Sequence, residues 1–322
     1  MKILVTGGAG YVGSTLVPLL LARGHRVRVL DNLIHGGQPL LPVWADPSFE
    51  FRRGDIRDRA TLREALKGVE GVVHLAAIVG DPACAREPEL ARAVNLDAPR
   101  MLLEEMKRER VARLIFASTC SNYGKMKDPT VYVDESSDLA PVSLYAETKV
   151  AVERDLLDGS QHDGLCATPL RFATVFGVSP RMRFDLTVNE FTMEMLTKGR
   201  LTVFGEQFWR PYIHVRDAAR GIAEVLSAPA DAVRGEVFNV GSTAENYQKA
   251  TLVELIRPHA PAAVVDFVQK QEDPRDYRVS FSRFTDRFGF SVTRTVPDGI
   301  AEVARLVRDG ILRDFDQPGY RN

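Results

Sequence analysis

A glycine-rich turn close to the N-terminus constrains the fold of this chain more than any other feature. Gly7, Gly10 and Gly13 follow a β-rich run, Lys2–Thr6, and open a helical stretch at Tyr11–Ala22. Glycines let the backbone turn tightly and approach a pyrophosphate, which then lies on the N-terminus of the helix. A plain turn would use the same residues, but their place between a strand and a helix predicts a dinucleotide-binding site.

Alternation of short strands and amphipathic helices continues through the first half of the chain. This alternation predicts an α/β fold with a doubly wound parallel sheet of the Rossmann type, in which ligands bind beyond the carboxyl ends of the strands. The expected strands are Lys2–Thr6, Arg26–Leu30, Phe49–Arg53, Gly71–Leu75, Arg113–Ala117 and Leu165–Leu170, and the expected helices are Tyr11–Ala22, Ala60–Leu66, Pro88–Arg108 and Ser143–Leu157.

The pattern becomes less regular after Arg171, which predicts a second, smaller unit. We expect residues 1–175 to form the dinucleotide-binding domain, and residues 176–209 and 242–322 to form a discontinuous α/β substrate lobe that caps the cleft. Segments within 210–241 are expected to return to the sheet region, with strands at Tyr212–Val215 and Val237–Val240 on either side of a helix at Asp217–Ser227.

Composition and charge exclude several classes of function. The 322 residues are 45% hydrophobic and 26% charged, the net charge is −1, and no long basic block supports nucleic-acid binding. No stretch approaches the roughly 18 apolar residues of a membrane span. Cys84, Cys120 and Cys166 are odd in number and lack metal-ligand spacing, which indicates reduced thiols, no metal site and a cytoplasmic protein.

The second, third and fourth predicted strands end on residues that suit a dinucleotide. Asp31 ends the second strand, where a carboxylate accepts hydrogen bonds from an adenosine ribose and repels a 2′-phosphate, which favours NAD over NADP. A strand-end turn is the alternative reading of this aspartate. Asp55 and Ile56 end the third strand and would border the adenine. His74, for which we expect packing rather than chemistry, precedes Leu75–Ala77, where the backbone can approach the cofactor.

Tyr145 and Lys149 form the strongest catalytic signal in the chain. They are four residues apart in a predicted helix, Ser143–Leu157, and therefore share one face. A nearby ammonium favours the phenolate of a tyrosine, whose pKa is otherwise about 10, so Tyr145 is a candidate acid/base. In isolation the pair would be read as helix surface. A second pair, Tyr123 and Lys127, contains a glycine and is expected in a loop.

Together these features resemble the extended short-chain dehydrogenase/reductase family, especially its sugar-nucleotide epimerases and dehydratases. The resemblance covers nearly the whole chain, and the order and spacing of its parts make chance an unlikely explanation. The parts are the glycine motif at 7–13, Asp31-Asn32-Leu33, Asp55, His74 to Ala77, Asn95, Ser118-Thr119 before Tyr123-Gly124, Tyr145 with Lys149, Arg171, Val175 to Gly177, Arg210 to Asp217, Phe238 to Gly241, and Pro274-Arg275.

The resemblance implies that NAD is the cofactor, that a nucleotide-diphosphate sugar is the substrate, and that the chain forms a homodimer. The residues that match cofactor-binding positions are Gly7, Gly10, Tyr11, Val12, Gly13, Asp31, Asn32, Asp55, Ile56, Leu75, Ala76, Ala77, Asn95, Tyr145 and Lys149. Family members often pair through the helices expected at Pro88–Arg108 and Ser143–Leu157. Leu102, Leu103, Val150 and Leu157 would lie in that contact or face their own sheet.

Three residues would carry the chemistry that the resemblance implies. Thr119 matches the Ser/Thr that hydrogen-bonds the reacting sugar oxygen, and Tyr145 matches the acid/base. Lys149 would bridge the nicotinamide ribose and lower the pKa of Tyr145.

Further positions match substrate-binding residues of the family. The expected set is Thr119, Cys120, Ser121, Asn189, Arg210 and Arg275. Asn189 and the two arginines match residues near the diphosphate, and the planar fork of a guanidinium suits phosphate. Either arginine alone would be read as part of a surface salt bridge. Two other stretches, Pro180–Asn189 with two arginines and Gly205–Pro211 with two aromatics, could shape a base or sugar pocket or pack in the lobe core.

One departure from the family bears on the reaction. In the 4,6-dehydratases an Asp–Glu pair follows the catalytic threonine, whereas Cys120 and Ser121 follow Thr119 here. Eliminating water across C5 and C6 of a hexose needs an acid and a base beyond the tyrosine. Cys120 would have to serve, although a neutral thiol is more often a buried packing residue.

The resulting expectation is an NAD-dependent nucleotide-sugar 4-epimerase. Tyr145 would take the proton of the sugar 4-hydroxyl while hydride passes from C4 to NAD, and the 4-keto sugar would rotate before it is reduced on its other face. A reductase of a 4-keto nucleotide sugar is the first alternative, although Asp31 disfavours NADPH. A dehydratase and a non-catalytic NAD-binding regulator are weaker alternatives.

Overall fold

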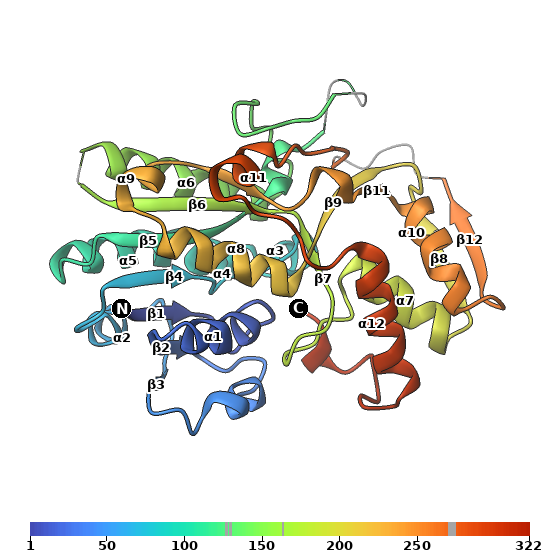
Figure 1. Ribbon diagram of the computed structural model, residues 1–322, viewed down its shortest axis with the longest axis horizontal. Helices are drawn as coiled ribbons and strands as arrows, with labels where there is room; N and C mark the ends of the chain where they lie inside the picture. The colour runs from blue at the N-terminus through green and yellow to red at the C-terminus, as the bar shows by residue number, and fades with distance from the viewer. Residues whose placement is uncertain (126–127, 129–130, 163, 270–274) are drawn as a thin grey trace.

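A seven-stranded parallel sheet forms the left part of the molecule in Figure 1. The computed structural model describes residues 1–125, 128, 131–162, 164–269 and 275–322, so Lys127 and Pro274 lie outside the described residues. The strand order is β3-β2-β1-β4-β5-β6-β10, which confirms the doubly wound fold. Its strands are β1 (Lys2–Thr6), β2 (Arg26–Asp31), β3 (Phe49–Arg53), β4 (Gly71–His74), β5 (Arg113–Thr119), β6 (Cys166–Phe172) and β10 (Phe238–Val240).

Helices cover both faces of this sheet. Alternate residues of a strand point to opposite faces, so Ile3 and Val5 of β1 pack in one core while Leu4 packs in another. The first core includes residues of α1 (Gly13–Ala22) and α8 (Val215–Ser227), which lie side by side on that face (Figure 1). The opposite core includes residues of α2 (Arg59–Leu66), α5 (Ala98–Arg108) and α6 (Leu144–His162).

The helix expected at Pro88–Arg108 is interrupted. It consists of α4 (Pro88–Arg92), a π-helical turn at Ala93–Asp97 and α5. A π turn inside a helix often marks a functional position, and this one contains Asn95. The shorter elements of this half are α3 (Asp81–Arg86), α9 (Ala230–Val233), α11 (Ser282–Phe288) and 3-10 turns at Gln38–Val43 and Cys120–Tyr123.

A smaller lobe lies at the right of Figure 1 and has its own apolar core. The core includes the buried side chains of Phe176, Tyr212 and Ile300. The helices of the lobe are α7 (Thr187–Thr197), α10 (Lys249–Ile256) and α12 (Val296–Arg308), and its two-stranded parallel sheet pairs β8 (Arg200–Phe204) with β12 (Val264–Val268). Three 3-10 turns complete it, at Thr243–Glu245, Arg257–His259 and Pro318–Tyr320.

One of the two strands expected to return to the main sheet does not do so. The strand expected at Tyr212–Val215 exists as β9 (Trp209–His214), but it pairs with β7 (Thr174–Phe176) and β11 (Asn246–Gln248) in a separate three-stranded sheet. Ala173 separates β6 from β7, and β7 pairs with β9 outside the main sheet. The other returning strand, β10, pairs with β6 as expected.

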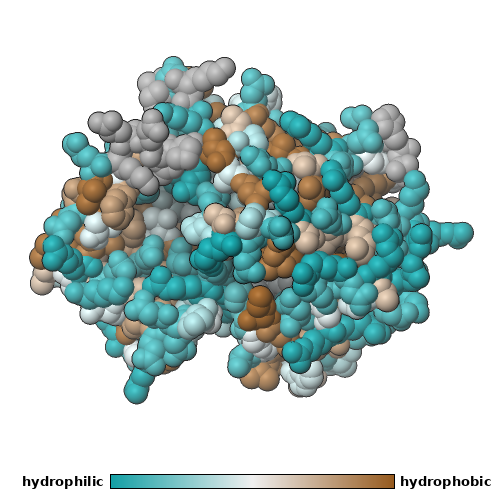
Figure 2. Space-filling model, turned by 180° about the vertical axis from the view of Figure 1, so that it is seen from behind, coloured by the Kyte–Doolittle hydropathy of each residue, from teal (hydrophilic) through white to brown (hydrophobic). Residues whose placement is uncertain are grey.

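The described part of the surface in Figure 2 has no large hydrophobic patch. Figure 2 shows a face on which hydrophilic residues predominate and hydrophobic residues form small groups. Leu102 and Val150, two of the residues expected to favour pairing of chains, are buried within their own chain, and Leu102 belongs to the core beneath the sheet. Within the described residues, no helix has the length and apolar character that a membrane span requires.

Candidate active site

The glycine turn after β1 is shaped by contacts that only glycine permits. Gly7 has a φ of 73°, and a Cβ built on it would lie 2.7 Å from the backbone nitrogen of Ala76. A Cβ on Gly13 would lie 2.3 Å from the carbonyl oxygen of Gly7. Both positions therefore exclude a larger residue, and they bring the first turn of α1 close to the segment that follows β4.

The N-terminus of α1 fits a phosphate group. Among the described residues, the backbone N–H groups of Tyr11, Val12 and Gly13 have no hydrogen-bond acceptor. Unpaired amides at a helix N-terminus attract anions, because the helix dipole is positive there. The residues present therefore fit the diphosphate of a dinucleotide cofactor, with Gly10 leaving room for its approach, since only the Gly7 carbonyl oxygen lies near a Cβ built there.

Asp31 lies at the end of β2, next to this turn. Its carboxylate accepts hydrogen bonds from the amides of Ala9 (3.0 Å) and Leu33 (2.8 Å). Burial raises the pKa of Asp31, and these two hydrogen bonds oppose the rise because they favour the charged form. The carboxylate is still partly exposed and has further lone pairs for a ribose. Asn32 beside it is exposed and accepts a hydrogen bond from Ile34.

The other predicted cofactor residues differ in burial and in the groups that they bind. Asp55 pairs with Arg57 at 2.7 Å, which lowers the pKa of the carboxyl, and Ile56 is buried. Asn95 is also buried and binds both backbone groups of Ile78, accepting from its N–H at 2.8 Å and donating to its carbonyl at 2.9 Å. Asn95 thus holds the segment after β4, where Leu75, Ala76 and Ala77 are partly exposed.

Lys149 lies on α6 with its ammonium against the end of β5. Its Nζ donates to the carbonyl oxygen of Ala117 at 2.8 Å and lies 4.5 Å from the ring centre of Phe116 and 5.9 Å from that of Tyr145. Burial lowers the pKa of Lys149 to about 8, while Glu153 opposes the shift. The Lys149 ammonium is therefore buried and still mostly charged at neutral pH, and Glu153 favours this charged form.

The pKa of Tyr145 in this structure differs from the sequence-based expectation. Burial raises it above the ordinary value, and the charge of Arg183 opposes this rise. The Lys149 ammonium donates to the carbonyl of Ala117 and lies 5.9 Å from the centre of the Tyr145 ring.

Thr119 and Ser121 lie together where β5 ends. The Thr119 hydroxyl accepts a hydrogen bond from the amide of Ser121 at 3.0 Å, and Ser121 Oγ lies 3.2 Å from the hydroxyl of Tyr277. Tyr277 comes from the lobe side of the chain and also acts on the pKa of Tyr145. The structure thus brings together hydroxyl groups from β5, α6 and the segment before α11.

Cys120, which was expected to bind substrate, has a buried side chain. Its side chain is 1% exposed, belongs to the core beneath α8, and its Sγ donates to the carbonyl oxygen of Arg171 at 3.3 Å. Burial raises the pKa of this thiol well above its usual value. The side chain of Cys120 therefore has a packing role in this structure, because an apolar core disfavours the thiolate.

A buried polar network lies directly behind Thr119 and Lys149, and the sequence reasoning missed most of it. Glu153 is one turn beyond Lys149 on α6 and binds Arg171 of β6, with Nη2 to Oε2 at 2.8 Å. Ser118 and Asn122 donate to the same carboxylate. Tyr123 connects Arg171 (3.0 Å) to Asn239 (2.7 Å). The four-residue spacing of Lys149 and Glu153, which places both on one face of a helix, was the sequence signal that could have indicated this network.

Asn189, expected to contact the diphosphate, is fully buried and its amide is used within the chain. Its oxygen accepts from the amide of Gly177 at 2.9 Å, and its nitrogen donates to the carbonyl of Arg183 at 2.8 Å. The same nitrogen donates to the hydroxyl of Tyr11, in the glycine turn, at 3.2 Å. Asn189 therefore supports the loop before α7 in this structure, because its side chain is enclosed by that loop.

The two predicted phosphate arginines lie on the lobe side. Arg210 is buried, stacks over Tyr277 at 5.3 Å and donates to the carbonyl of Trp209. Arg275 is more exposed and pairs with Asp81 at 2.9 Å, and Asp81 in turn accepts a hydrogen bond from Ser143 at the start of α6. This ion pair connects the two parts of the molecule beside Tyr145.

Comparison with known proteins identifies the family. Residues 3–241 match the model of the NAD dependent epimerase/dehydratase family. The chain is 31% identical over 275 residues to the UDP-glucose 4-epimerase of Corynebacterium glutamicum, covering 80% of each chain. It is also 31% identical over 322 residues to a dTDP-glucose 4,6-dehydratase of an Actinoplanes strain, covering 96% of this chain and 98% of the other.

Solved structures of the same two kinds superpose on this fold. A UDP-glucose 4-epimerase from Thermus thermophilus, in complex with NAD, has a TM-score of 0.84 at 27% identity, with coverage of 96% and 100%. A dTDP-glucose 4,6-dehydratase from Streptomyces venezuelae, also solved with NAD, has a TM-score of 0.85 at 28% identity, with coverage of 96% and 98%. The chain belongs to the NAD dependent epimerase/dehydratase family of nucleotide-sugar enzymes, and NAD is its cofactor.

Proposed function

We propose that this enzyme is a nucleotide-sugar 4-epimerase. The relatives are epimerases and dehydratases at the same identity, so the choice depends on the residues beside Thr119. Cys120 is buried with its thiol donating to a backbone carbonyl, and Ser121 is a neutral hydroxyl. The two positions that would need an acid and a base for elimination of water therefore offer neither, and this observation carries the proposal.

The chain's own residues suit removal and return of a proton at the sugar 4-hydroxyl. NAD supplies the hydride acceptor and donor for the adjacent carbon. Tyr145 would take the hydroxyl proton, and Thr119 would hold the same oxygen. Burial raises the pKa of Tyr145, so the phenol keeps its proton until positive charge is placed beside it. Lys149, whose pKa is lowered to about 8, would bind the nicotinamide ribose. Its ammonium would then supply positive charge beside Tyr145.

The remaining assignments belong to the same proposal. Arg210 and Arg275 would bind the diphosphate of the substrate, and Arg275 would then exchange Asp81 for phosphate oxygens. Asn189 would act by supporting the loop that encloses it. Residues 1–175 with parts of 210–241 would bind the cofactor, while 176–209 and 242–322 would bind the sugar nucleotide. A cytoplasmic homodimer completes the proposal.

The test is product analysis with purified protein, NAD and a panel of UDP-, GDP-, dTDP- and CDP-sugars in deuterated water. We expect an isomer of unchanged mass from at least one sugar, without net formation of reduced cofactor. Tyr145→Phe protein, purified in the same way, is the control and should give no product. Chromatography separates the isomers, and mass spectrometry identifies incorporated deuterium.

Three other results would contradict the proposal, and each points to a different reaction. Loss of water from the sugar would favour a dehydratase and would require another acid than the buried Cys120 thiol. Deuterium bound to carbon would indicate proton exchange beside a keto group, as in 3- or 5-epimerisation. Reaction only with a supplied 4-keto sugar and reduced cofactor would favour a reductase.

A further inference from the structure

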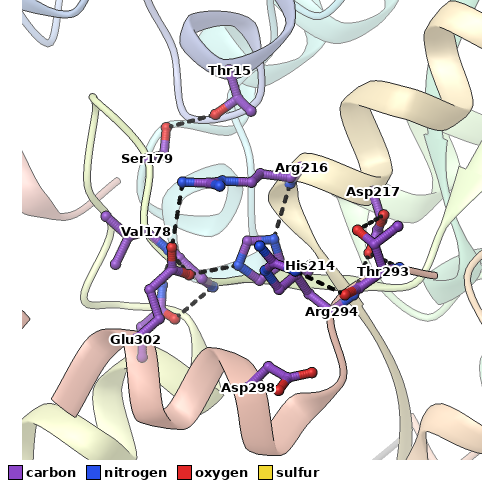
Figure 3. Close-up of polar contacts among 12 residues, drawn as sticks. Thr15, Val178, Ser179, His214, Arg216, Asp217, Thr293, Arg294, Asp298 and Glu302 are labelled. Atoms are coloured by element: carbon purple, nitrogen blue, oxygen red, sulfur yellow. Dashed lines mark hydrogen bonds and ion pairs between the residues drawn. The ribbon is translucent and has the colours of Figure 1, made fainter. Parts of the chain in front are cut away.

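A short loop from the lobe side is bound to the first turn of α1. We call residues Gly177–Arg183 the clamp segment. The hydroxyl of Tyr11 donates to the carbonyl of Gly177 at 2.6 Å, and Ser179 Oγ donates to the carbonyl of Tyr11 at 2.7 Å. Ser179 Oγ also lies 3.3 Å from the hydroxyl of Thr15 (Figure 3). It lies 3.0 Å from the hydroxyl of Ser14. The clamp segment therefore lies directly beside the glycine turn.

The start of the clamp segment is held in place by α12. Glu302 accepts a hydrogen bond from the amide of Val178 at 3.3 Å and lies 2.7 Å from Nε2 of the buried His214 (Figure 3). His214 Nδ1 accepts from the amide of Arg216, so the ring proton is on Nε2 and is donated to Glu302. A Cβ on Gly177 would lie 2.2 Å from the same Nε2, so the backbone packs tightly against this pair.

The end of the segment is bound by the last residues of the chain. Phe184 donates its amide to the carbonyl of Tyr320 at 2.9 Å, and Arg181 Nη2 donates to the carbonyl of Arg321 at 2.9 Å. Anchors at both ends, together with Asn189, leave the clamp segment little freedom to move away from α1.

The clamp segment carries two buried arginines, Arg181 and Arg183. Arg181 is 3% exposed, and its Nε has no hydrogen-bond partner among the described residues. Arg183 is 8% exposed and uses Nε and Nη2 to bind Asp185 at 2.9 and 2.8 Å. The charge of Asp185, which Arg183 binds, also acts on Arg181. A buried cation without full compensation is costly, which indicates that an anion belongs at this position.

Electrostatic effects on neighbouring groups support this placement. Burial lowers the pKa of Arg181 to about 10, and the charge of Arg183 acts in the same direction. Burial also lowers the pKa of His35 to about 4, with Arg181 and Arg183 as the next contributors, so His35 adds no charge at neutral pH. Burial raises the pKa of Tyr145, and Arg183 opposes that rise. Arg183 is therefore close enough to both His35 and Tyr145 for its charge to act on their pKa values.

We propose that Arg181 and Arg183 bind the diphosphate of NAD from the side opposite the N-terminus of α1. The cofactor must extend from Asp31 to Tyr145 and Lys149, and the clamp segment lies along this path beside the glycine turn. The diphosphate carries two negative charges, which the helix N-terminus and one net positive charge from Arg181, Arg183 and Asp185 would balance. Guanidinium forks suit such oxygens geometrically.

The substrate also contains a diphosphate, but different arginines are placed for it. Arg210 lies against Tyr277, and Arg275 lies against Asp81, both near Thr119 and Ser121 rather than beside the glycine turn. The clamp arginines are therefore assigned to the cofactor. In this arrangement the lobe side contributes to cofactor binding as well as to substrate binding.

Calorimetric titration of NAD-free protein with NAD, ADP-ribose and adenosine tests the assignment. Arg181→Gln and Arg183→Gln should each weaken NAD and ADP-ribose binding by about 10- to 100-fold, the effect of one charged hydrogen bond, and leave adenosine binding unchanged. Arg216→Gln is the matched control, because Arg216 is exposed and lies 3.7 Å from the same Glu302. Its NAD affinity should equal that of the wild-type protein.

Two outcomes would overturn the assignment. The first is unchanged NAD affinity in both clamp variants. The second is unchanged NAD affinity with weakened binding of UDP or dTDP to NAD-loaded protein, which would place the substrate diphosphate here. If Arg181→Gln does not unfold cooperatively, Arg181→Lys keeps the charge without the fork, and the assignment requires that it bind NAD more weakly than the wild-type protein.

Discussion

The nucleotide-binding half and the lobe hold their polar site residues in different ways. In the first half the backbone determines the positions, as at Gly7 and Gly13, where only glycine fits, and at Asp31, which two amides hold. On the lobe side, side chains from distant segments hold one another. Asn189 binds Gly177, 12 residues away, and Tyr11, 178 residues away.

The difference explains why the two parts give unequal signals in the sequence. A site at strand ends and helix starts follows from local patterns, because the backbone conformation itself presents the binding groups. A site made by contacts between distant side chains has no such pattern. Variants in the two parts of the molecule should therefore differ in their effects on catalysis and stability.

The largest expected effect is on kcat, and it should distinguish Tyr145 of the nucleotide-binding half from Tyr277 of the lobe side. Tyr145→Phe should lower kcat about 10²- to 10⁴-fold, the contribution of a general acid/base, and leave NAD affinity unchanged. Tyr277→Phe removes one hydrogen bond to Ser121 and should lower kcat less than about 10-fold. Steady-state kinetics and NAD titration measure both. Equal losses in the two variants would mean that the lobe tyrosine takes part in proton transfer.

The next effect concerns the buried ion pair behind the site. Arg171→Met should lower the free energy of unfolding by about 3–5 kcal/mol, because Glu153 would remain buried without its cation. Arg100→Gln is the matched control, since its pair with Asp155 is largely exposed and should contribute less than about 1 kcal/mol. Urea unfolding measures both changes. A loss below 1 kcal/mol in Arg171→Met would show that the network does not support the first half.

A smaller effect is expected on the lobe side. Asn189→Ala leaves the amide of Gly177 and the carbonyl of Arg183 without partners and should lower the free energy of unfolding by about 1–3 kcal/mol. NAD affinity should fall as well, because the clamp segment would loosen. Thr197→Ala, near the end of the same helix, removes only a hydroxyl bonded to Met193 and serves as the control. Unchanged stability in Asn189→Ala would contradict the supporting role of this residue.

The smallest expected effect is a pH dependence that originates in the first half. Burial, with Lys149 nearby, lowers the pKa of His74 to about 3, while the unfolded chain titrates it near pH 6.5. Between these values the unfolded state binds the extra proton, so stability falls as pH falls below about 6.5, by at most about 1.4 kcal/mol per pH unit. His74→Gln should reduce this slope, measured by urea unfolding between pH 7 and 5. An unchanged slope would show that His74 is not the group responsible.

Most of the nucleotide-binding half could be predicted from the sequence. β1 and β3 begin and end at the predicted residues, and the other strands of the main sheet differ by one or two residues at an end. The helix at Pro88–Arg108 was expected to be continuous, and the π turn around Asn95 was missed. Asn95 in that turn binds the backbone of Ile78, a contact with a residue outside the helix that periodicity does not record.

The lobe was predicted in outline but not in its pairings. The short strands β7, β8, β11 and β12 were missed, because each is three to five residues long and pairs with a distant segment. β9 was recognised as a strand but assigned to the wrong sheet. For the stretch Pro180–Asn189, which overlaps the clamp segment, the sequence leaves both a pocket and the lobe core open, since the position of this loop depends on α1, α12 and the C-terminal residues together.

The sequence by itself determined the parallel sheet, the glycine turn, Asp31 and the spacing of Tyr145 and Lys149, because each depends on residues that are close along the chain. Only the tertiary structure decided that the Cys120 thiol is buried, that Asn189 supports a loop, and that the Lys149 ammonium donates to the carbonyl of Ala117. It also decided where two buried arginines lie relative to the glycine turn. Burial and pairing are properties of segments brought together by folding, and they set which of the predicted groups remain free to bind and react.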